Sequence, residues 1–382
     1  MIAQVMPSIL VLWLLASCSS QGALLTVSNS LDFARNEIIS IDRSELMGVL
    51  ACDEPIQILE PGNKQVLPIQ FLDLDQDQEW ESILTQIQIG PSESQELRIL
   101  NTPKEQVGIE KKVFGRLVPE RKDDFAWEND RIAFRMYGPA LEATGEISSG
   151  IDVWVKSVEY PIVNKWYATE DYHKDHGEGA DFYKVGPTLG AGGLGLLLND
   201  TLYTSKNFTD SRILAAGPLQ FIFELDYAAW GPDSIIISET KRFTLDAGQH
   251  FNRVESTVNL ARGLPGNASF VTGLVSHPSP SLNPVSLNSS DDYMILYEEF
   301  AGGNGALGTA IIRSFTPQQE RIKKYGNQYL MVLPFDDPKS VSYYAGAGWT
   351  KSPWIDDEAD WLEMVRTFIQ SKNNPLKIER TN

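Results

Sequence analysis

Residues 219–227 read LQFIFELDY, and this stretch decides the fold class. Apolar side chains occupy every second position on one face: Leu219, Phe221, Phe223 and Leu225. Polar side chains occupy the opposite face: Gln220, Glu224 and Asp226. Because successive side chains of a strand point to opposite sides, this pattern predicts a strand with one face in a core and one in solvent.

The same alternation recurs along the chain. Residues 131–137 (RIAFRMY) place Arg131, Arg135 and Tyr137 on one face of a predicted strand. Seven further runs are strand-like and separated by turn residues: 235–245, 251–260, 268–276, 293–300, 307–315, 329–335 and 340–346. No alternation of strands with helices and no phosphate-binding loop is found, so we expect a mostly antiparallel β-sandwich, with few helices.

One helix is expected near the end of the chain. Its apolar residues recur at helical spacing: Trp361, Val365, Phe368 and Ile369. Three acidic residues, 356–358, stand at its start, where the helix dipole favours negative charge. A length of 382 residues suggests two domains at about 150 residues each. We expect an N-terminal β region at 18–110 and a main β-sandwich at 111–382, after a signal peptide at 1–17.

The formal net charge is −19. Phosphate attraction needs a basic surface, so this charge argues against a nucleic-acid partner. It does not exclude a small anionic substrate, because a few lysines or arginines can converge in one pocket of an acidic protein.

The leader contains an apolar run that ends in Leu15-Ala16-Ser17-Cys18. This has the form of a bacterial lipoprotein cleavage site, which predicts lipidation of Cys18 and a lipid-anchored protein of the cell envelope, in the periplasm or at the outer membrane. The alternative is an ordinary secretory signal with a chance cysteine. The mature chain would keep only Cys52 besides Cys18, so we expect no internal disulfide.

The densest polar stretch is residues 170–188, EDYHKDHGEGADFYKVGPT. It has too few apolar residues for a core strand and is expected to be a functional loop. Three interpretations remain open. His173, His176 and Glu178 could bind a divalent metal; a histidine and Tyr183 could do acid–base chemistry beside lysines such as Lys184; or the loop could simply be solvated.

Three other features offer binding groups. Arg131 and Arg135 on one strand face could clamp a carboxylate, or could form a surface salt-bridge ladder. Trp349, followed by Lys351, could stack on a sugar or close the sandwich edge. Acidic residues 73, 75, 77 and 79 have spacing that could hold calcium, or could be a solvated hairpin tip. His250 and His277 are expected to be structural.

Three segments resemble a bacterial family known as a domain of unknown function: residues 120–141, 171–193 and 343–352. That family occurs in gene clusters for polysaccharide degradation and is similar to the galactose-mutarotase-like supersandwich proteins. One of its branches contains a dehydratase that acts on oligosaccharides from ulvan. The resemblance therefore implies a supersandwich and a carbon–oxygen lyase that removes water from a uronate at the non-reducing end.

The residues can be tested against this chemistry. Elimination removes the proton on C5 of a uronate, and it needs a base, an acid at the oxygen on C4 and groups that neutralise the carboxylate. His173 or His176 could be the base and Tyr183 the acid, with Lys184 in the catalytic group. Residues expected to bind substrate are Arg121, Trp127, Arg131, Arg135, Trp349 and Lys351. No cofactor is required.

Three alternatives remain at this point. A sugar leaving group would make the enzyme a polysaccharide lyase. A glycoside hydrolase would need two carboxylates, for which Glu178 with Asp181 or Glu224 with Asp226 could serve. A non-catalytic glycan-binding lipoprotein would use Trp127 and Trp349 as stacking platforms. The oligomeric state is not predicted.

Overall fold

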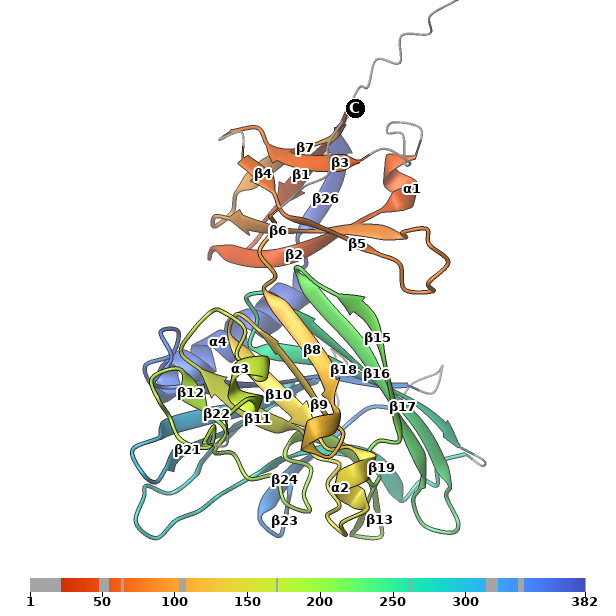
Figure 1. Ribbon diagram of the computed structural model, residues 1–382, viewed down its shortest axis with the longest axis vertical. Coiled ribbons are helices and arrows are strands. Elements are labelled where there is room, and N and C mark those ends of the chain that lie inside the picture. The colour runs from red at the N-terminus through yellow and green to blue at the C-terminus, as the bar shows by residue number, and fades with distance from the viewer. Residues whose placement is uncertain are drawn as a thin grey trace, which may run out of the picture.

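A computed structural model describes residues 22–47, 55–62, 65–102, 108–169, 171–260, 263–313, 322–335 and 340–381 (Figure 1). The expected signal peptide, Cys18 and Cys52 lie outside the described residues. The chain folds into two stacked β regions, of which the smaller contains residues 22–102 (Figure 1). No helix among the described residues is long and apolar enough to span a bilayer.

The N-terminal region is a small sandwich of two antiparallel sheets. One sheet has the order β26 (Lys377–Thr381), β1 (Ala23–Ser28), β7 (Ser94–Asn101), β3 (Ile56–Glu60) and β4 (Gln65–Leu67). The other has the order β2 (Arg35–Asp42), β6 (Ser82–Ile89) and β5 (Ile69–Leu72), and α1 (Arg43–Leu46) follows β2. Leu25 and Val27 of the first sheet share a core with Ile41 and Ile83 of the second.

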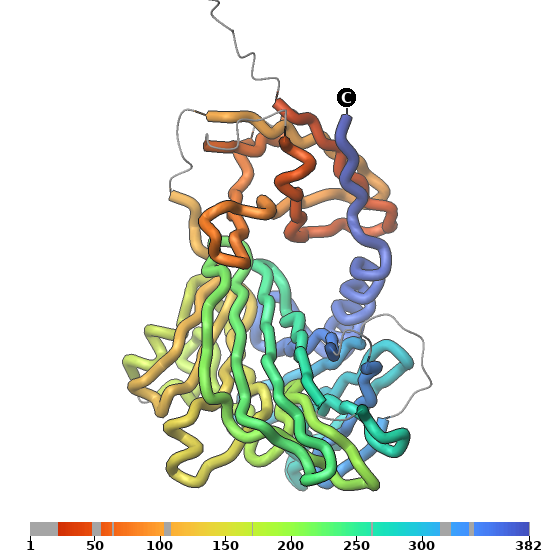
Figure 2. Tube along the Cα trace, turned by 90° about the vertical axis from the view of Figure 1, so that its right-hand side faces the viewer, coloured from red at the N-terminus to blue at the C-terminus, as the bar shows by residue number. Residues whose placement is uncertain are grey.

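The last strand of the chain belongs to this N-terminal region. β26 pairs with β1 over five residue pairs, from Leu24 opposite Thr381 to Ser28 opposite Lys377. Sequence reasoning assigned residues 377–381 to the main sandwich, because strand pairing over such a distance leaves no local signal. Figure 2 shows the C-terminal helix leading up into this strand.

The main region contains three antiparallel sheets. The largest has the order β15 (Asp210–Ala216), β16 (Gln220–Trp230), β17 (Ile237–Asp246), β18 (Phe251–Leu260), β25 (Ser340–Trp349), β22 (Gly305–Arg313), β21 (Tyr293–Phe300) and β20 (Ser286–Ser289). A second has the order β12 (Gly179–Ala180), β11 (Asp152–Lys156), β10 (Ile132–Met136), β9 (Asp124–Asn129) and β8 (Val113–Val118). The third has the order β14 (Thr201–Thr204), β13 (Ala191–Leu198), β19 (Ala268–Val275), β24 (Gln328–Val332) and β23 (Ile322–Tyr325).

Helical segments in the main region are few. They are the 3₁₀ turn η1 (Pro119–Arg121) and the helices α2 (Pro139–Glu142), α3 (Val163–Tyr167) and α4 (Glu358–Asn373). α4 is the helix expected from sequence. Its N-cap Asp357 accepts hydrogen bonds from the backbone N–H groups of Ala359 and Asp360. The prediction of a mostly antiparallel β protein with few helices is confirmed.

The alternation in residues 219–227 produces the core of the main region. Phe223 on β16 lies opposite Phe243 on β17, and the two rings stack at 4.9 Å. Phe125 from β9 stacks on Phe223 at 4.2 Å, which joins the second sheet to the largest one. Trp127 fills the space beside them, and its Nε1 donates to Oδ1 of Asn252 at 2.7 Å.

Candidate functional site

A cavity of about 730 Å³ opens where the second sheet meets the turns of the largest one. Five segments line it: the end of β10, the loop between α3 and β12, the segment between β12 and β13, the segment after β19 and the β21–β22 turn. The residues that carry its chemistry are Arg135, Tyr137, His173, Asp181, Lys184, His277 and Glu299. Arg135, His173 and Tyr183 thus lie on one cavity, although they come from different elements.

Arg135 lies below the cavity wall among three carboxylates. Its Nη2 is 2.5 Å from Oδ2 of Asp152 and 3.0 Å from Oδ2 of Asp181, and its Nη1 is 3.8 Å from Oδ2 of Asp124. All four side chains are buried. One guanidinium cannot balance three ionised carboxylates in so buried a place, because unpaired charge is costly there.

The pKa values of all three carboxyls are raised. Burial is the largest cause, and it raises the pKa of Asp181 well above its usual range, with the neighbouring charge of Asp152 adding to the effect. Burial also raises the pKa of Asp152, and it raises that of Asp124 to about 7. The charge imbalance and the raised pKa values both favour protonation of one of the three carboxyls.

His173 is oriented as a base. Its Nδ1 lies 2.8 Å from the backbone oxygen of Asp181. A carbonyl oxygen only accepts hydrogen bonds, so Nδ1 carries the proton of the neutral ring and Nε2 carries the lone pair. The ring also packs on Tyr172 at 4.3 Å, and Arg121 lies over the other aromatic rings of this stack, 5.0 Å from Tyr172.

Tyr137 is the cavity phenol that sequence reasoning missed. It is only part-buried, and its hydroxyl lies 3.5 Å from Nη2 of Arg135. The hydroxyl of Tyr183, the expected acid, is instead enclosed by protein, beside the backbone of Val275. Burial raises the pKa of both phenols well above the usual value. The strand alternation of residues 131–137 already placed Tyr137 on the face of Arg135, which was the available signal.

His277, which was expected to be structural, also lines the cavity. Its Nδ1 lies 2.8 Å from Oε1 of Glu298, and its Nε2 lies 2.7 Å from the backbone oxygen of Lys184. Both partners only accept, so the ring satisfies both contacts as an imidazolium. Burial opposes this charge, but the hydrogen bond and charge of Glu298 prevail, and the pKa of His277 is raised. The Lys184 side chain itself is exposed at the cavity rim.

The proposed metal ligands do not come together. His176 Nε2 contacts Asp171 at 3.1 Å on the exposed side of the loop. Glu178 binds Tyr160 and Lys165, away from His173. Within the described residues, the acidic side chains that do come together are Asp73, Asp75, Asp77 and Glu81 at the β5–β6 turn. One carboxylate oxygen from each lies within 4.8 Å of the others, close enough to hold a metal ion. Glu81 takes the position expected for Glu79, which pairs with Arg43.

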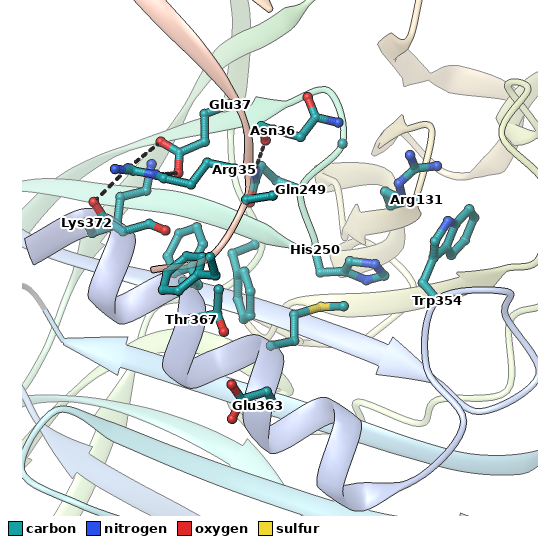
Figure 3. Close-up of a pocket in the computed structure, with 17 residues that line it drawn as sticks. Arg35, Asn36, Glu37, Arg131, Gln249, His250, Trp354, Glu363, Thr367 and Lys372 are labelled. Atoms are coloured by element: carbon teal, nitrogen blue, oxygen red, sulfur yellow. Dashed lines mark hydrogen bonds and ion pairs between the residues drawn. The ribbon is translucent and has the colours of Figure 1, made fainter. Parts of the chain in front are cut away.

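The arginine clamp expected on β10 is not formed. Arg131 lies at a separate cavity of about 360 Å³ between the N-terminal region and α4, where its guanidinium stacks 4.6 Å over Trp354 (Figure 3). It also donates to Glu159 at 2.7 Å. His250 lines the same cavity. Arg131 and Arg135 therefore cannot hold one carboxylate.

Two tryptophans expected to bind sugar are buried. Trp127 is 0% exposed in the core, and Trp349 is 3% exposed with its Nε1 donating to the backbone oxygen of Asn304 at 2.6 Å. Neither ring offers a face to a ligand. Lys351 does not line the cavity. It forms an ion pair with Asp175 of the 171–180 segment at 3.3 Å. Arg121 does not line the cavity either, and lies over the ring of Tyr172.

Neither carboxylate pair expected for a hydrolase lies together on the cavity. Glu178 does not line the cavity that Asp181 lines. Glu224 and Asp226 bind Arg212 on the outer face of β16, at 2.6 and 2.7 Å.

Comparison with solved structures defines the class of fold. The chain is similar to an α-mannosidase from Enterococcus faecalis V583, with a TM-score of 0.53 and 8% identity over 94% of this chain and 46% of that one. A glycosyl hydrolase family 38 protein from the same species gives a TM-score of 0.52 and 9% identity over 94% and 47%. The chain thus spans about half the length of these proteins and shares a β-rich fold with them.

Comparison of sequences defines the family. Residues 27–378 match the family described as Domain of unknown function (DUF4861), so the chain belongs to that family. It is also 35% identical to "Uncharacterized protein P7" of Formosa agariphila over 96% of both chains. The match includes the N-terminal region and the main region, so the two regions occur together in the family.

Proposed function

We propose that the 730 Å³ cavity is the active site of a carbon–oxygen lyase that acts on uronic-acid oligosaccharides such as those of ulvan. Dehydration at a non-reducing-end uronate is preferred over chain cleavage. The observation that carries this proposal is the placement of His173, whose Nε2 has no hydrogen-bond partner among the described residues, on the same cavity as the phenol of Tyr137. The volume lies within the range of about 300–1,000 Å³ typical of small-ligand sites.

The proposed reaction uses these two groups in turn. Nε2 of His173 takes the proton from C5, and the electrons of that bond form an enolate with the uronate carboxylate. The enolate then forms the C4–C5 double bond as the bond from C4 to its oxygen breaks. Tyr137 supplies a proton to the departing oxygen, so that water leaves, or a sugar hydroxyl if the oxygen belonged to a glycosidic bond.

Two further observations support a sugar substrate. The fold is shared with proteins named as an α-mannosidase and a glycosyl hydrolase, which are enzymes of carbohydrates. The cavity wall also carries polar groups for hydroxyls beside the apolar rings of Phe182 and Phe300, which pack at 4.8 Å. Sugars present both kinds of surface.

Incubation with ulvan oligosaccharides tests the proposal. We expect a rise in the ultraviolet absorbance of an unsaturated uronate, with loss of one water from the mass of the oligosaccharide. His173→Ala should lower the rate by about 100-fold or more, because a positioned base contributes that much. His176→Ala, on the same loop but outside the cavity, is the matched control and should keep the wild-type rate.

Each other outcome selects a different function. A rise in ultraviolet absorbance together with shorter oligosaccharides identifies a polysaccharide lyase. New reducing ends without absorbance identify a hydrolase, for which Asp181 and Glu299 are the carboxyls that share the cavity. Binding without any product over a broad panel of uronate oligosaccharides contradicts the enzyme proposal.

We further propose that the protein is anchored in the cell envelope through a lipid on Cys18. In a bacterial host, the wild-type chain should partition with membranes, and the Cys18→Ala chain should not. Recovery of both in the soluble fraction contradicts the anchor.

A further inference from the structure

The three carboxyls around Arg135 have unequal sets of hydrogen-bond donors. Asp152 receives Nε of Arg135 at 2.8 Å, Nη2 at 2.5 Å, the backbone N–H of Val153 at 3.0 Å and Nε1 of Trp154 at 3.3 Å. Four donors stabilise a carboxylate, so Asp152 is the ionised partner of the guanidinium.

The carboxyl of Asp181 has fewer hydrogen-bond donors than that of Asp152. Among the described residues, the side-chain donors in contact with its carboxyl are Nη2 of Arg135 at 3.0 Å and Nδ1 of His173 at 3.4 Å, both on Oδ2. The first of these is shared with Asp152, and the second has a shorter bond to the Asp181 backbone oxygen. Oδ1 of Asp181 therefore remains for a ligand.

Position also distinguishes Asp181 from Asp124. Asp181 lines the cavity, whereas Asp124 lies behind it, with Oδ1 enclosed by protein. The groups that face Asp181 are Arg135 and Tyr137 at the end of β10, Asp152 on β11, Asp124 on β9 and His173 in its own loop. One cation among these carboxyls leaves an excess of negative charge beside a site meant for an anionic sugar.

We propose that Asp181 keeps its proton at neutral pH and, as a neutral carboxylic acid, donates a hydrogen bond from Oδ1 to the carboxylate of the bound uronate. The inference rests on the proposed function and adds the group that recognises the substrate carboxylate. A hydrogen bond from an acid strengthens as the enolate develops charge, so it stabilises the transition state more than the bound substrate. The proton stays on Asp181 throughout.

Asp181→Asn tests the protonation directly, since an amide has the shape and donor of the neutral acid but cannot ionise. We expect its kcat/KM to stay within about tenfold of the wild type, whereas Asp181→Ala loses about 100-fold. In the wild type, kcat/KM should fall at alkaline pH as Asp181 ionises and repels the substrate, and this fall should be absent in Asp181→Asn.

Asp152→Asn is the matched control. It removes a carboxylate that we infer to be ionised, so it should lower activity far more than Asp181→Asn does. The inference is overturned if Asp181→Asn and Asp181→Ala lose kcat/KM equally while both variants unfold at the wild-type temperature. That result leaves the proposed function intact as long as the wild-type chain still forms the unsaturated product.

A measurement without substrate separates the two proposals. Infrared difference spectra between the wild type and each variant at neutral pH should show loss of the carbonyl stretch of a protonated carboxylic acid in Asp181→Asn, and little or no loss in Asp124→Asn. A band that disappears in Asp124→Asn instead assigns the proton to Asp124 and overturns the inference. If this band behaves as expected but no uronate is converted, the proposed function fails and the protonation of Asp181 stands.

Discussion

Tyr137 and Tyr183 differ in the surroundings of their hydroxyl groups, and this difference decides which can donate a proton. The Tyr137 hydroxyl lies beside Arg135 on the cavity, whereas that of Tyr183 is enclosed. Tyr137→Phe should lower the rate of product formation by about 100-fold, since a positioned acid contributes about this much. Steady-state kinetics on the oligosaccharide substrate measures the loss.

Tyr183→Phe is the control for Tyr137→Phe, because it removes a hydroxyl that is enclosed by protein and so cannot reach a substrate. It should leave the rate within about twofold and change the stability by no more than about 1.5 kcal/mol, the net worth of one hydrogen bond. A large rate loss in Tyr183→Phe with none in Tyr137→Phe would restore the original assignment of the acid.

His277 makes stability depend on pH. Its pKa is raised in the folded protein above the unfolded value of about 6.5, so the folded state binds its proton more tightly. The resulting stability is fully present below pH 6.5 and is lost as the pH rises through the folded pKa. Urea unfolding of the wild type and of His277→Gln at several pH values should converge as the pH rises. A constant gap between the two would contradict this.

At the scale of elements, Arg35 joins the first sandwich to the last helix. Its side chain is 1% exposed, and it donates to the backbone oxygens of Ser371 and Asn374 at 3.1 and 2.8 Å, at the C-terminal end of α4. Its Nε donates to Glu37 at 2.7 Å. A buried cation thus binds the carbonyl groups that a helix end leaves without intrahelical partners.

Arg35→Ala should lower the free energy of unfolding by about 3 kcal/mol, because Glu37 and two helix carbonyls lose a buried donor. Chemical denaturation measures this loss. The control is Arg98→Ala on β7, which removes an exposed arginine and should change stability by less than about 0.5 kcal/mol. A similar small effect of Arg35→Ala would show that the helix end is satisfied by water instead.

Local patterns predicted the elements better than their partners. Alternation placed Arg135 and Tyr137 on one face, and helical spacing with Asp357 located the start of α4 within a residue. Alternation could not show that Asp152 and Asp181 would surround Arg135, since that depends on pairing between segments 17 and 46 residues away. The prediction of a clamp by Arg131 and Arg135 was wrong for the same reason. Arg131 contacts Glu159 and Trp354, whereas Arg135 contacts Asp152 and Asp181.

Aromatic residues were misjudged in a consistent way. Trp127 and Trp349 were expected to bind substrate, with closure of the sandwich edge as the alternative for Trp349, and both are buried. Burial depends on which sheet covers a strand, and one strand's sequence does not contain that information. The stretch 171–188 is mostly loop, as predicted, but residues 179 and 180 form the buried strand β12. Its two histidines divide between the cavity and the solvent.

At the scale of the whole molecule, we expect the pairing of β26 with β1 to hold the two regions in one folding unit. Removing residues from Lys377 onward should expose the edge of β1 and lose several hydrogen bonds worth about 1 kcal/mol each. Calorimetry should then show an early transition from the N-terminal region, ahead of the main one. Glu379→Ala, which keeps the strand, should unfold in the same manner as the wild type.

The side chain of Gln70 adds a second link between the regions. Its Oε1 accepts from the backbone N–H groups of Leu219 and Gln220 at 2.8 Å, and its Nε2 donates to the backbone oxygen of Gln220 at 3.0 Å. The small sandwich therefore holds the first residues of β16, the strand that begins the core of the main region. If the chain without β26 shows a single calorimetric transition in which both regions unfold together, contacts such as those of Gln70 are sufficient to keep the two regions cooperative.

The pairing of β1 with β26 also sets how the molecule responds to force. Leu24 and Thr381 lie opposite each other, so a load applied to the two ends of the described chain acts at the same end of one antiparallel pair. The hydrogen bonds of that pair then break one after another, as in opening a zipper, and never all together in shear. An optical trap that grips both ends should record a low, graded peeling of β26 before the sandwiches rupture.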